Sequence, residues 1–397
     1  MNPIRPEIEA LERSGIAKVA AGALDDPEVI PLWFGESDIV TPEFIRAAAT
    51  RALEGGKTFY SHARGQTALR SALKRYNDRI YKIDLDPDRI TVPGSTMLAV
   101  MVAAQCLLGR DDEAILIAPY WPNIRIVTQI LGGRHVDVRL EEGPGRWWLD
   151  LDKVAAAITP RTKAVYVNSP ANPTGWIMTE DEQRALLDLC RKHGLGIIAD
   201  EVYHRNVFDG PDPAPSFLTI AGDDEPVFVL NGFSKGWAMT GWRLGWMVAP
   251  RHLEEPMAVL AECSNTSATA FVQFGGVAAL EEGEPFIEGF VARTRRNRDL
   301  VMEILGAGLA PQARRCLLRL PEDRRGDRQP RSGPPHPGRD QGRHGRRLHL
   351  RAGQRGPSAA LLRDRHAAPA DRARAHRWRA RPARLTAGGP PVDQRSG

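Results

Sequence analysis

Residues 231–245 read NGFSKGWAMTGWRLG and directly follow a short apolar run at 226–230. Lys235 therefore stands at the end of a predicted strand, with Arg243 eight residues later. Aromatic residues flank the lysine, and loss of water around an amine lowers its pKa and makes it nucleophilic toward an aldehyde. Taken alone, however, Lys235 is more simply explained as a surface lysine in a turn.

Short β-rich runs alternate with helical stretches from about residue 88 to residue 250. The predicted strands cover residues 89–92, 114–118, 135–140, 163–168, 196–200, 226–230 and 244–248. Several of these runs are almost continuous Ile, Val and Leu, which is typical of strands buried on both faces. The alternation predicts an α/β fold with a mostly parallel sheet, and ligands usually bind at the carboxyl ends of such strands.

One helix can be located closely between two of these strands. Thr179 and Glu182 stand three residues apart, as in a capping box, and Gly194 stands where a C-terminal cap is expected. Further helices are predicted at 97–108 and at 286–305.

Two more segments place polar side chains after predicted strands. Residues 168–175 read NSPANPTG, which on its own is an ordinary Asn-Pro turn that contains Asn172. Residues 197–203 read IIADEVY, so that Asp200 ends a buried strand. A buried carboxylate is costly without a positive partner, so a cationic ligand is an alternative to an Asp that caps the next turn.

Small residues precede the helix predicted at 97–108, namely Gly94, Ser95 and Thr96. Such residues at a helix N-terminus expose backbone N–H groups to an anion, although a plain helix cap is the simpler explanation. Trp121 follows the strand at 114–118, where an aromatic side chain either stacks on a ligand or packs at the rim of the core.

The net charge of the 397-residue chain is +5, but it is distributed unevenly. Residues 311–397 contain 22 Arg and no Lys and carry a net charge of +15, so residues 1–310 carry −10. The basic character is confined to the last 87 residues, and it gives no reason to expect that the main body binds nucleic acid.

The segment 311–397 also lacks Ile, Phe, Tyr, Met and Asn and has too few Leu and Val to build a core. It could be a natural disordered tail, an arginine-rich nucleic-acid-binding segment, or a GC-rich coding sequence read in a shifted frame. We favour the shifted frame because the composition changes abruptly after the helix at 286–305. Nucleic-acid binding ranks last because Trp378 is the one aromatic residue of the segment.

The sequence shows neither a membrane-spanning segment nor a signal peptide. The longest apolar run, 98–108, has about half of the ~20 residues that a spanning helix needs. The four cysteines are far apart and form no CxxC pair, which predicts reduced thiols of a cytoplasmic protein and no metal site. They are Cys106, Cys190, Cys263 and Cys316.

Together these elements resemble those of the fold-type I, pyridoxal-phosphate (PLP)-dependent aminotransferases of class I/II, the aspartate/aromatic aminotransferase-like group. The blocks NPTG, ADEVY and SK…MTGWRLG carry the resemblance, which covers roughly residues 30–305. It implies an α/β fold in which a mostly parallel mixed sheet with helices on both faces forms a large PLP domain, with a smaller α+β domain that is incomplete here. The expected parts are 1–32 (N-terminal arm and part of the small domain), 33–286 (large PLP-binding domain), 287–310 (start of the small domain) and 311–397 (aberrant tail, disordered or frameshifted).

The resemblance also implies a role for each polar residue. Lys235 would form the aldimine with PLP and carry a proton during catalysis, and Asp200 would pair with the pyridine nitrogen. Asn172 and Tyr203 would hydrogen-bond the phenolic oxygen of the ring, and Trp121 would stack on its face.

The residues implied to hold the phosphate are Gly94, Ser95, Thr96, Ser234 and Arg243. Tyr60 matches a tyrosine that reaches the phosphate of a neighbouring subunit, which implies a homodimer. Gly35 matches the N-terminal segment that closes over the substrate, and with Asn172 it is expected to bind substrate. Two departures stand out: Gly232 replaces a serine that is frequent in the family, and no arginine of 311–397 can be assigned to the substrate α-carboxylate.

The implied activity is transfer of an amino group between an amino acid and a 2-oxo acid, as part of amino acid metabolism and biosynthesis. A C–S lyase or a decarboxylase on the same scaffold is an alternative. An inactive PLP-binding protein that lacks the carboxylate-binding arginine is another. Neither a membrane nor a nucleic acid is expected as a partner.

Overall fold

The computed structural model describes residues 3–22, 26, 29–32, 34–143 and 146–305, and all of them belong to one unit, Met1–Gly326. The predicted tail at 311–397, which includes Cys316, lies outside the described residues, as does the end of the predicted segment 287–310. The domain boundaries expected from the sequence therefore stay predictions.

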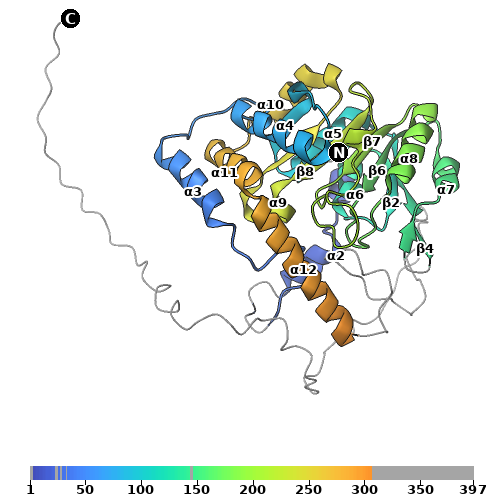
Figure 1. Ribbon diagram of the computed structural model, residues 1–397. Helices are drawn as coiled ribbons and strands as arrows, with labels where there is room; N and C mark the ends of the chain where they lie inside the picture. The colour runs from blue at the N-terminus through green and yellow to red at the C-terminus, as the bar shows by residue number, and fades with distance from the viewer. Residues whose placement is uncertain (1–2, 23–25, 27–28, 33, 144–145, 306–397) are drawn as a thin grey trace, which may run out of the picture. The chain divides into compact units, whose positions relative to one another are not determined.

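Seven strands in the described part of the chain form one mixed sheet in the order β1-β9-β8-β7-β6-β2-β3 (Figure 1). Their bounds are β1 (Ile90–Gly94), β2 (Glu113–Ala118), β3 (Arg134–Arg139), β6 (Thr162–Asn168), β7 (Gly196–Asp200), β8 (Val227–Gly232) and β9 (Gly245–Val248). The neighbours from β8 to β3 are parallel, whereas β9 runs antiparallel to both β8 and β1. The predicted mostly parallel mixed sheet is confirmed, and each predicted strand matches an observed one to within two residues.

A two-stranded hairpin, β4 (Glu141–Gly143) with β5 (Arg146–Trp148), was not expected from the sequence. The helices of the described chain lie between and around the strands. They are α1 (Pro6–Glu9), α2 (Gly15–Ala21), α3 (Glu43–Glu54), α4 (Thr67–Tyr81), α5 (Thr96–Leu107), α6 (Asn123–Ile130), α7 (Leu151–Ala157), α8 (Glu180–His193), α9 (Phe233–Gly236), α10 (Glu254–Asn265), α11 (Ala270–Glu282) and α12 (Glu284–Leu305).

Local sequence signals explain the ends of α8. The Thr179 side chain accepts a hydrogen bond from the Glu182 N–H while the Glu182 carboxylate accepts one from the Thr179 N–H, which is the predicted capping box. Gly194 ends the helix in the left-handed conformation with φ +65°.

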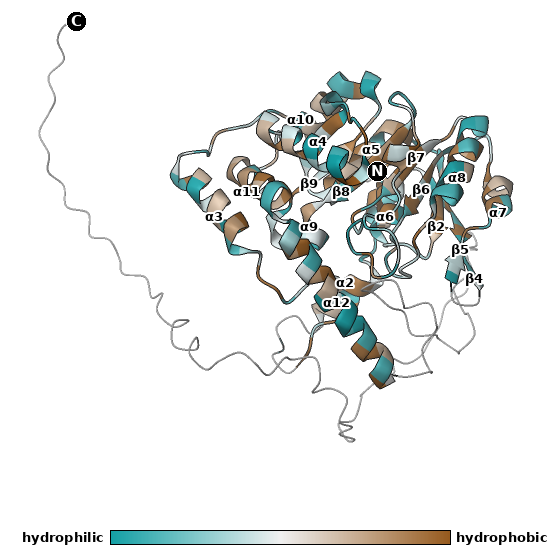
Figure 2. Cartoon of the chain, viewed as in Figure 1, coloured by the Kyte–Doolittle hydropathy of each residue, from teal (hydrophilic) through white to brown (hydrophobic). Residues whose placement is uncertain are grey.

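Helices cover both faces of the sheet because each strand alternates between two cores. In β2, Leu116 belongs to a core with α5, α6 and α10, whereas Ile115 and Ile117 belong to a core with α4, α8 and α11. Figure 2 shows the central strands largely in the brown of hydrophobic residues, with teal turns on the helices outside them. Strand β3, at one edge of the sheet, is mostly exposed, whereas β1 at the other edge is buried.

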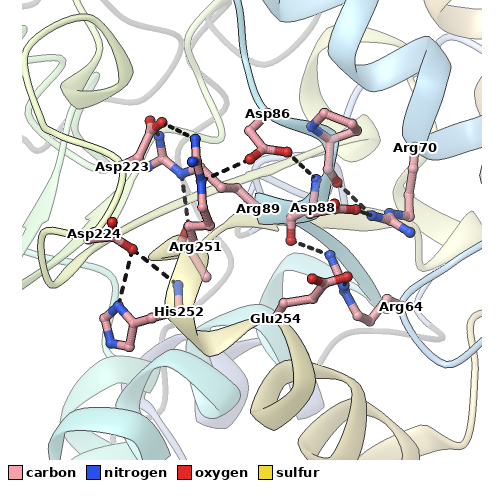
Figure 3. A network of polar contacts seen from close by, with 12 residues as sticks. Arg64, Arg70, Asp86, Asp88, Arg89, Asp223, Asp224, Arg251, His252 and Glu254 are labelled. Atoms are coloured by element: carbon pink, nitrogen blue, oxygen red, sulfur yellow. Dashed lines mark hydrogen bonds and ion pairs between the residues drawn. The ribbon is translucent and has the colours of Figure 1, made fainter.

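Charged side chains fasten the first strand to the loops beside it (Figure 3). Arg64 is buried and donates a hydrogen bond to the Glu254 carboxylate at 2.6 Å. Arg89, just before β1, is also buried and pairs with Asp223. Each guanidinium also lies near a second carboxylate, Asp88 for Arg64 and Asp86 for Arg89, so that its charge is compensated by more than one partner. Arg64 also donates hydrogen bonds to the Thr91 hydroxyl and to the Ile90 carbonyl, so the network holds the start of β1.

Strand β9 passes very close to the N-terminus of α5. A Cβ atom added at Gly245 would lie 2.6 Å from the backbone nitrogen of Thr96 and 2.9 Å from the carbonyl oxygen of Asn231. Both neighbours are backbone atoms, so they cannot rotate away as a flexible side chain could. Position 245 therefore requires glycine for steric reasons.

We expect Gly245→Ala to lower the free energy of unfolding by about 1–3 kcal/mol, as overpacking in a well-packed core does. Urea denaturation of the two proteins would measure the difference. The matched control is Gly289→Ala in α12, where an added Cβ meets no atom within 4 Å and a better helix former replaces glycine. Equal stability of Gly245→Ala and the parent would contradict the steric argument.

Candidate active site

A cavity of about 810 Å³ opens at the carboxyl ends of β6, β7 and β8. Its lining includes nine of the twelve site residues predicted from the sequence: Gly35, Thr96, Trp121, Asn172, Asp200, Tyr203, Ser234, Lys235 and Arg243. These residues come from strand ends and loops that are far apart in the sequence. The parallel arrangement of the strands brings them to one edge of the sheet.

Three predicted site residues do not line this cavity. Gly94 and Ser95 are buried at the junction of β1 and α5, where the Ser95 hydroxyl accepts a hydrogen bond from the Leu98 N–H at 3.3 Å as the helix cap. The Tyr60 side chain is 88% exposed to solvent. The expected phosphate contacts of Gly94 and Ser95 and the expected intersubunit role of Tyr60 stay predictions.

Lys235 lies in the short helix α9, directly after β8, and its ammonium group points toward the N-terminal segment. The Nζ atom donates a hydrogen bond to the carbonyl oxygen of Gly35 and lies 5.9 Å from the centre of the Tyr203 ring. Burial lowers the pKa of Lys235 below its usual value; the carboxylate of Glu36 opposes this shift and the guanidinium of Arg243 adds to it. The desolvated lysine inferred from the sequence is thus present at the strand end.

Asp200 ends β7 and is buried at the edge of the cavity. One carboxylate oxygen accepts a hydrogen bond from the Tyr166 hydroxyl at 2.9 Å, and the other accepts one from the Val202 N–H at 3.2 Å. Burial raises the pKa of this carboxyl above its usual value, while the two donors and the charge of Lys235 act against the rise. Because both hydrogen-bond donors are neutral, a cationic ligand in the cavity would complete the environment of Asp200.

The turn that carries Asn172 is positioned by another amide. The side-chain nitrogen of Asn168 donates to the carbonyl of Asp200 at 2.8 Å, and its oxygen accepts from the backbone N–H of Asn172 at 2.7 Å. Asn168 thereby joins the ends of β6 and β7 and sets the height of the turn above the sheet. The NSPANPTG segment contains Asn168, but the sequence does not show that Asn168 connects two strands, because this depends on the pairing of β6 with β7.

Thr96 explains the absence of a serine at position 232. Its hydroxyl donates a hydrogen bond to the carbonyl of Asn231 at 3.0 Å, and a Cβ atom added at Gly232 would lie 2.1 Å from the hydroxyl oxygen. A side chain at 232 and the present position of Thr96 therefore exclude each other. The departure from the family pattern has a steric cause, and the hydroxyl of Thr96 lines the cavity at this point.

The N-terminal segment lines the cavity to an extent that sequence reasoning missed. Apart from Gly35, its lining residues are Ser14, Gly15, Ile16, Ala17, Val19, Leu32 and Phe34. These residues lie about 200 positions from Lys235 in the chain, and no local motif marks them. What distinguishes them in the structure is that several are large apolar side chains exposed to solvent.

Buried polar contacts hold the loop that follows β7 and carries Tyr203. The Glu201 carboxylate accepts a hydrogen bond from the Phe217 N–H at 3.0 Å, and the His204 ring nitrogen Nε2 lies 2.7 Å from the Tyr76 hydroxyl oxygen. Burial raises the pKa of Glu201 to about 8 and lowers the pKa of His204 to about 3. Both side chains are therefore neutral near pH 7.

The chain is similar in sequence and in structure to known proteins. Residues 27–314 match the family model "Aminotransferase class I and II". The chain belongs to this family. The arginine–pyruvate transaminase of Pseudomonas aeruginosa is 36% identical over 286 residues, which is 72% of each chain. The aspartate/prephenate aminotransferase of Thermus thermophilus is 33% identical over 316 residues, 77% of this chain and 80% of the relative.

Solved structures lead to the same assignment for this aminotransferase. A single mutant of the aspartate aminotransferase of Thermus thermophilus superposes with a TM-score of 0.71 at 33% identity, covering 77% of this chain and 80% of the other. The aspartate aminotransferase of Rhizobium meliloti gives a TM-score of 0.69 at 29% identity, covering 76% and 77%. The predicted family, fold type and amino-group transfer are confirmed, and these comparisons give no support to the lyase, decarboxylase or inactive alternatives.

None of the helices described for this aminotransferase combines the length and the apolar composition that crossing a bilayer requires.

The raised pKa of Glu201 predicts a pH dependence of stability. The folded protein keeps the Glu201 proton up to about pH 8, whereas the unfolded chain loses it near the ordinary value of 4.5. The stability that Glu201 contributes is thus fully present below about pH 4.5 and is lost as the pH rises toward about 8. We expect Glu201→Gln, which stays neutral, to become progressively more stable relative to the parent over this range.

Urea denaturation at several pH values between 4.5 and 8 measures this difference. Glu255→Gln, on the exposed side of α10, is the control for loss of a surface carboxylate. A difference between Glu201→Gln and the parent that stays constant with pH would refute a buried, protonated Glu201.

Proposed function

We propose that this aminotransferase binds PLP in the cavity at the strand ends and that Lys235 holds the aldehyde of the cofactor. Class I and II aminotransferases depend on PLP. The observation that carries the proposal is that the desolvated amine of Lys235 and the buried carboxylate of Asp200 line the same cavity. A nucleophilic amine and a buried carboxylate are the two groups that an aldehyde on a protonated pyridine ring requires.

The remaining lining residues fit the other parts of the cofactor. The hydroxyl of Ser234 and the guanidinium of Arg243 are donors suited to a phosphate, and both line the cavity together with Thr96, whose hydroxyl proton is already donated to the carbonyl of Asn231. Trp121 offers an aromatic face for the ring. Asn172 and Tyr203 are the proposed donors to its phenolic oxygen; Asn172 lies on the turn fixed by Asn168, and Tyr203 lies beside Lys235.

The chain's own groups then have distinct tasks. Bound PLP supplies a conjugated ring that accepts the electrons released when the substrate Cα loses a proton. Asp200 keeps the ring nitrogen protonated by offering it a negative charge in a site with little water. Lys235, whose pKa burial lowers, can take the proton from Cα and return it to the cofactor carbon, since its amine is neutral more often than that of a surface lysine.

A homodimer is part of the same proposal. Phe59 and Tyr60 are 83% and 88% exposed and adjacent in the chain, which supports a contact of Tyr60 with a second copy. The substrates are an amino acid and a 2-oxo acid, as for the related aminotransferases. The cytoplasmic location and the biosynthetic role expected from the sequence belong to this proposal as well.

Replacing Lys235 by alanine should abolish transamination, because Lys235 is the one lysine among the described residues that line the cavity, and it is proposed to supply both the covalent link and the mobile proton. The purified full-length protein, loaded with PLP, is mixed with an amino acid and with pyruvate or 2-oxoglutarate, and the absorption spectrum is followed. We expect the visible absorption of lysine-linked PLP to be absent from Lys235→Ala. The control Lys153→Ala changes an exposed lysine that pairs with Glu141 on the surface.

A visible band that persists unchanged in Lys235→Ala would overturn the role of Lys235. Turnover without any 2-oxo acid, with release of ammonia, would instead favour the lyase alternative. Saturation with PLP without reaction with any amino acid would favour the inactive alternative.

Asp200→Asn tests the proposed pairing with the ring nitrogen. Asparagine keeps an acceptor for the Tyr166 hydroxyl but carries no negative charge, so we expect PLP to bind while turnover falls by about 100-fold or more, as when a preorganised electrostatic contact is removed. Steady-state kinetics measure the loss. Asp188→Asn on the exposed face of α8 is the control. Unchanged turnover in Asp200→Asn would exclude the pairing.

A further inference from the structure

The hydroxyl group of Tyr166 lies inside an apolar core. Tyr166 is 1% exposed within β6, and in the sheet it pairs with Leu116 of β2 and with Ile198 of β7. The core around it consists of apolar side chains, so a phenylalanine would fill the position as well as a tyrosine. A buried hydroxyl is unfavourable in such surroundings unless it forms a hydrogen bond. Packing therefore does not explain the hydroxyl group; its hydrogen bond does.

The partner of this hydroxyl is the Asp200 carboxylate, and the register of two strands brings it within reach. Asn168, two residues after Tyr166, pairs with Asp200, so Tyr166 and Asp200 are diagonal neighbours on β6 and β7. A long aromatic side chain spans that separation, and the hydroxyl donates a hydrogen bond to the carboxylate at 2.9 Å. Among the described residues, Asp200 lines the cavity of the candidate active site and Tyr166 does not. Tyr166 thus contacts Asp200 from outside the cavity.

The hydrogen bonds to Asp200 leave acceptor capacity for a ligand. Tyr166 bonds to one carboxylate oxygen and the Val202 N–H bonds to the other at 3.2 Å, so the orientation of the carboxylate is fixed. An ionised carboxylate offers about four lone-pair sites, and these two donors use only part of them. Because Asp200 lines the cavity, a donor bound there can use the remaining sites.

Several groups act on the charge of Asp200. Burial raises the pKa of its carboxyl, whereas the hydrogen bond from Tyr166, that from a backbone N–H and the charge of Lys235 lower the pKa. The other titratable groups beside the pair of Tyr166 and Asp200 are Glu201, which stays neutral below about pH 8, and Tyr203 on the same loop. Without the Tyr166 hydroxyl, burial would be less opposed, and Asp200 would keep a proton to a higher pH.

We propose that Tyr166 is a positioning residue for transamination: its hydroxyl keeps the Asp200 carboxylate charged and oriented, so that the proton between Asp200 and the ring nitrogen of PLP stays on the nitrogen. The inference rests on the proposed function, because it concerns the pairing of Asp200 with that ring. Tyr166 itself gives up no proton. Burial and the neighbouring carboxylate raise the pKa of Tyr166 well above its usual value, so its hydroxyl remains a hydrogen-bond donor near pH 7.

The first test measures the stability of the full-length chain without added PLP. The folded-state pKa of Asp200 lies above the ordinary value of 3.8, so the stability that this carboxyl contributes is present at low pH and is lost as the pH rises through the folded-state pKa. Tyr166→Phe raises this pKa further, and we expect the variant to become progressively less stable than the parent as the pH rises. Urea denaturation at several pH values between about 5 and 8 measures the difference, in which the titration of Glu201, common to both proteins, cancels.

A double-mutant cycle with Asp200→Asn assigns this effect to Asp200. In the Asp200→Asn background, position 200 cannot take up a proton, so Tyr166→Phe should there cause a loss of stability that does not change with pH. A loss that is independent of pH while Asp200 is present would contradict the proposal, because removal of any buried hydrogen bond would produce it.

The second test uses the full-length protein loaded with PLP. We expect Tyr166→Phe to keep the visible absorption of lysine-linked PLP and to lower kcat by about 10-fold or more, as the loss of groups that orient metal ligands does. KM should stay nearly unchanged, because Tyr166 does not line the cavity. The control Tyr120→Phe removes a hydroxyl that donates to Asp137 at 2.8 Å beside the edge strand β3, and it should leave kcat unchanged. Equal kcat in Tyr166→Phe and in the parent would overturn the proposal.

The two tests separate this inference from the proposed function. If the parent chain binds no PLP or reacts with no amino acid, the proposed function fails and the role of Tyr166 in the reaction fails with it. The stability measurements still show in that case whether Tyr166 controls the charge of Asp200. If the parent is active and Tyr166→Phe is equally active, this inference alone fails.

Discussion

The buried carboxylate at the end of β7 is the constraint on which the site depends. Asp200 lies beneath the cavity among apolar strands, and its hydrogen bonds come from Tyr166 and from a backbone N–H, neither of which carries charge. A carboxylate kept in such surroundings is unfavourable until a positive charge meets it. The neighbouring strands place polar groups around Asp200: Asn168 at the end of β6 bonds to its carbonyl, and Lys235 follows β8.

Rigid support for this arrangement comes from polar groups behind the cavity. Arg205, in the loop that carries Tyr203, is buried and pairs with Asp212 at 2.8 Å and with Glu284 at the start of α12. The same loop is held by Glu201 and His204, both neutral in the interior. Since α12 also holds Asp38 through Arg293, one helix is bonded both to the loop that carries Tyr203 and to the segment that follows Gly35.

The sequence predicted the sheet and the floor of the site because both depend on local signals. Buried parallel strands are continuous apolar runs, and the residues that follow them meet at one edge whatever the details of packing, so Asp200, Asn172 and Lys235 could be placed together. The part of the cavity lining formed by Ile16, Val19, Leu32 and Phe34 could not be predicted, because the segments beside it are held by contacts of Arg5, Glu36 and Asp38 with partners more than 100 residues away. The glycine at 232 could not be explained from the sequence either, because the Thr96 hydroxyl that excludes a side chain there is far away in the chain.

The hydrogen bond from Lys235 to the carbonyl of Gly35 links the chemical state of the lysine amine to the position of residues 35–38. Any process that changes the donor at Nζ, by removing a proton or by using the amine to form a covalent bond, changes the energy with which residues 35–38 are held. By thermodynamic reciprocity, binding of residues 35–38 at this place changes the free energy of deprotonating or modifying the Lys235 amine by the same amount. The hold on residues 35–38 therefore depends on the chemical state of the Lys235 amine.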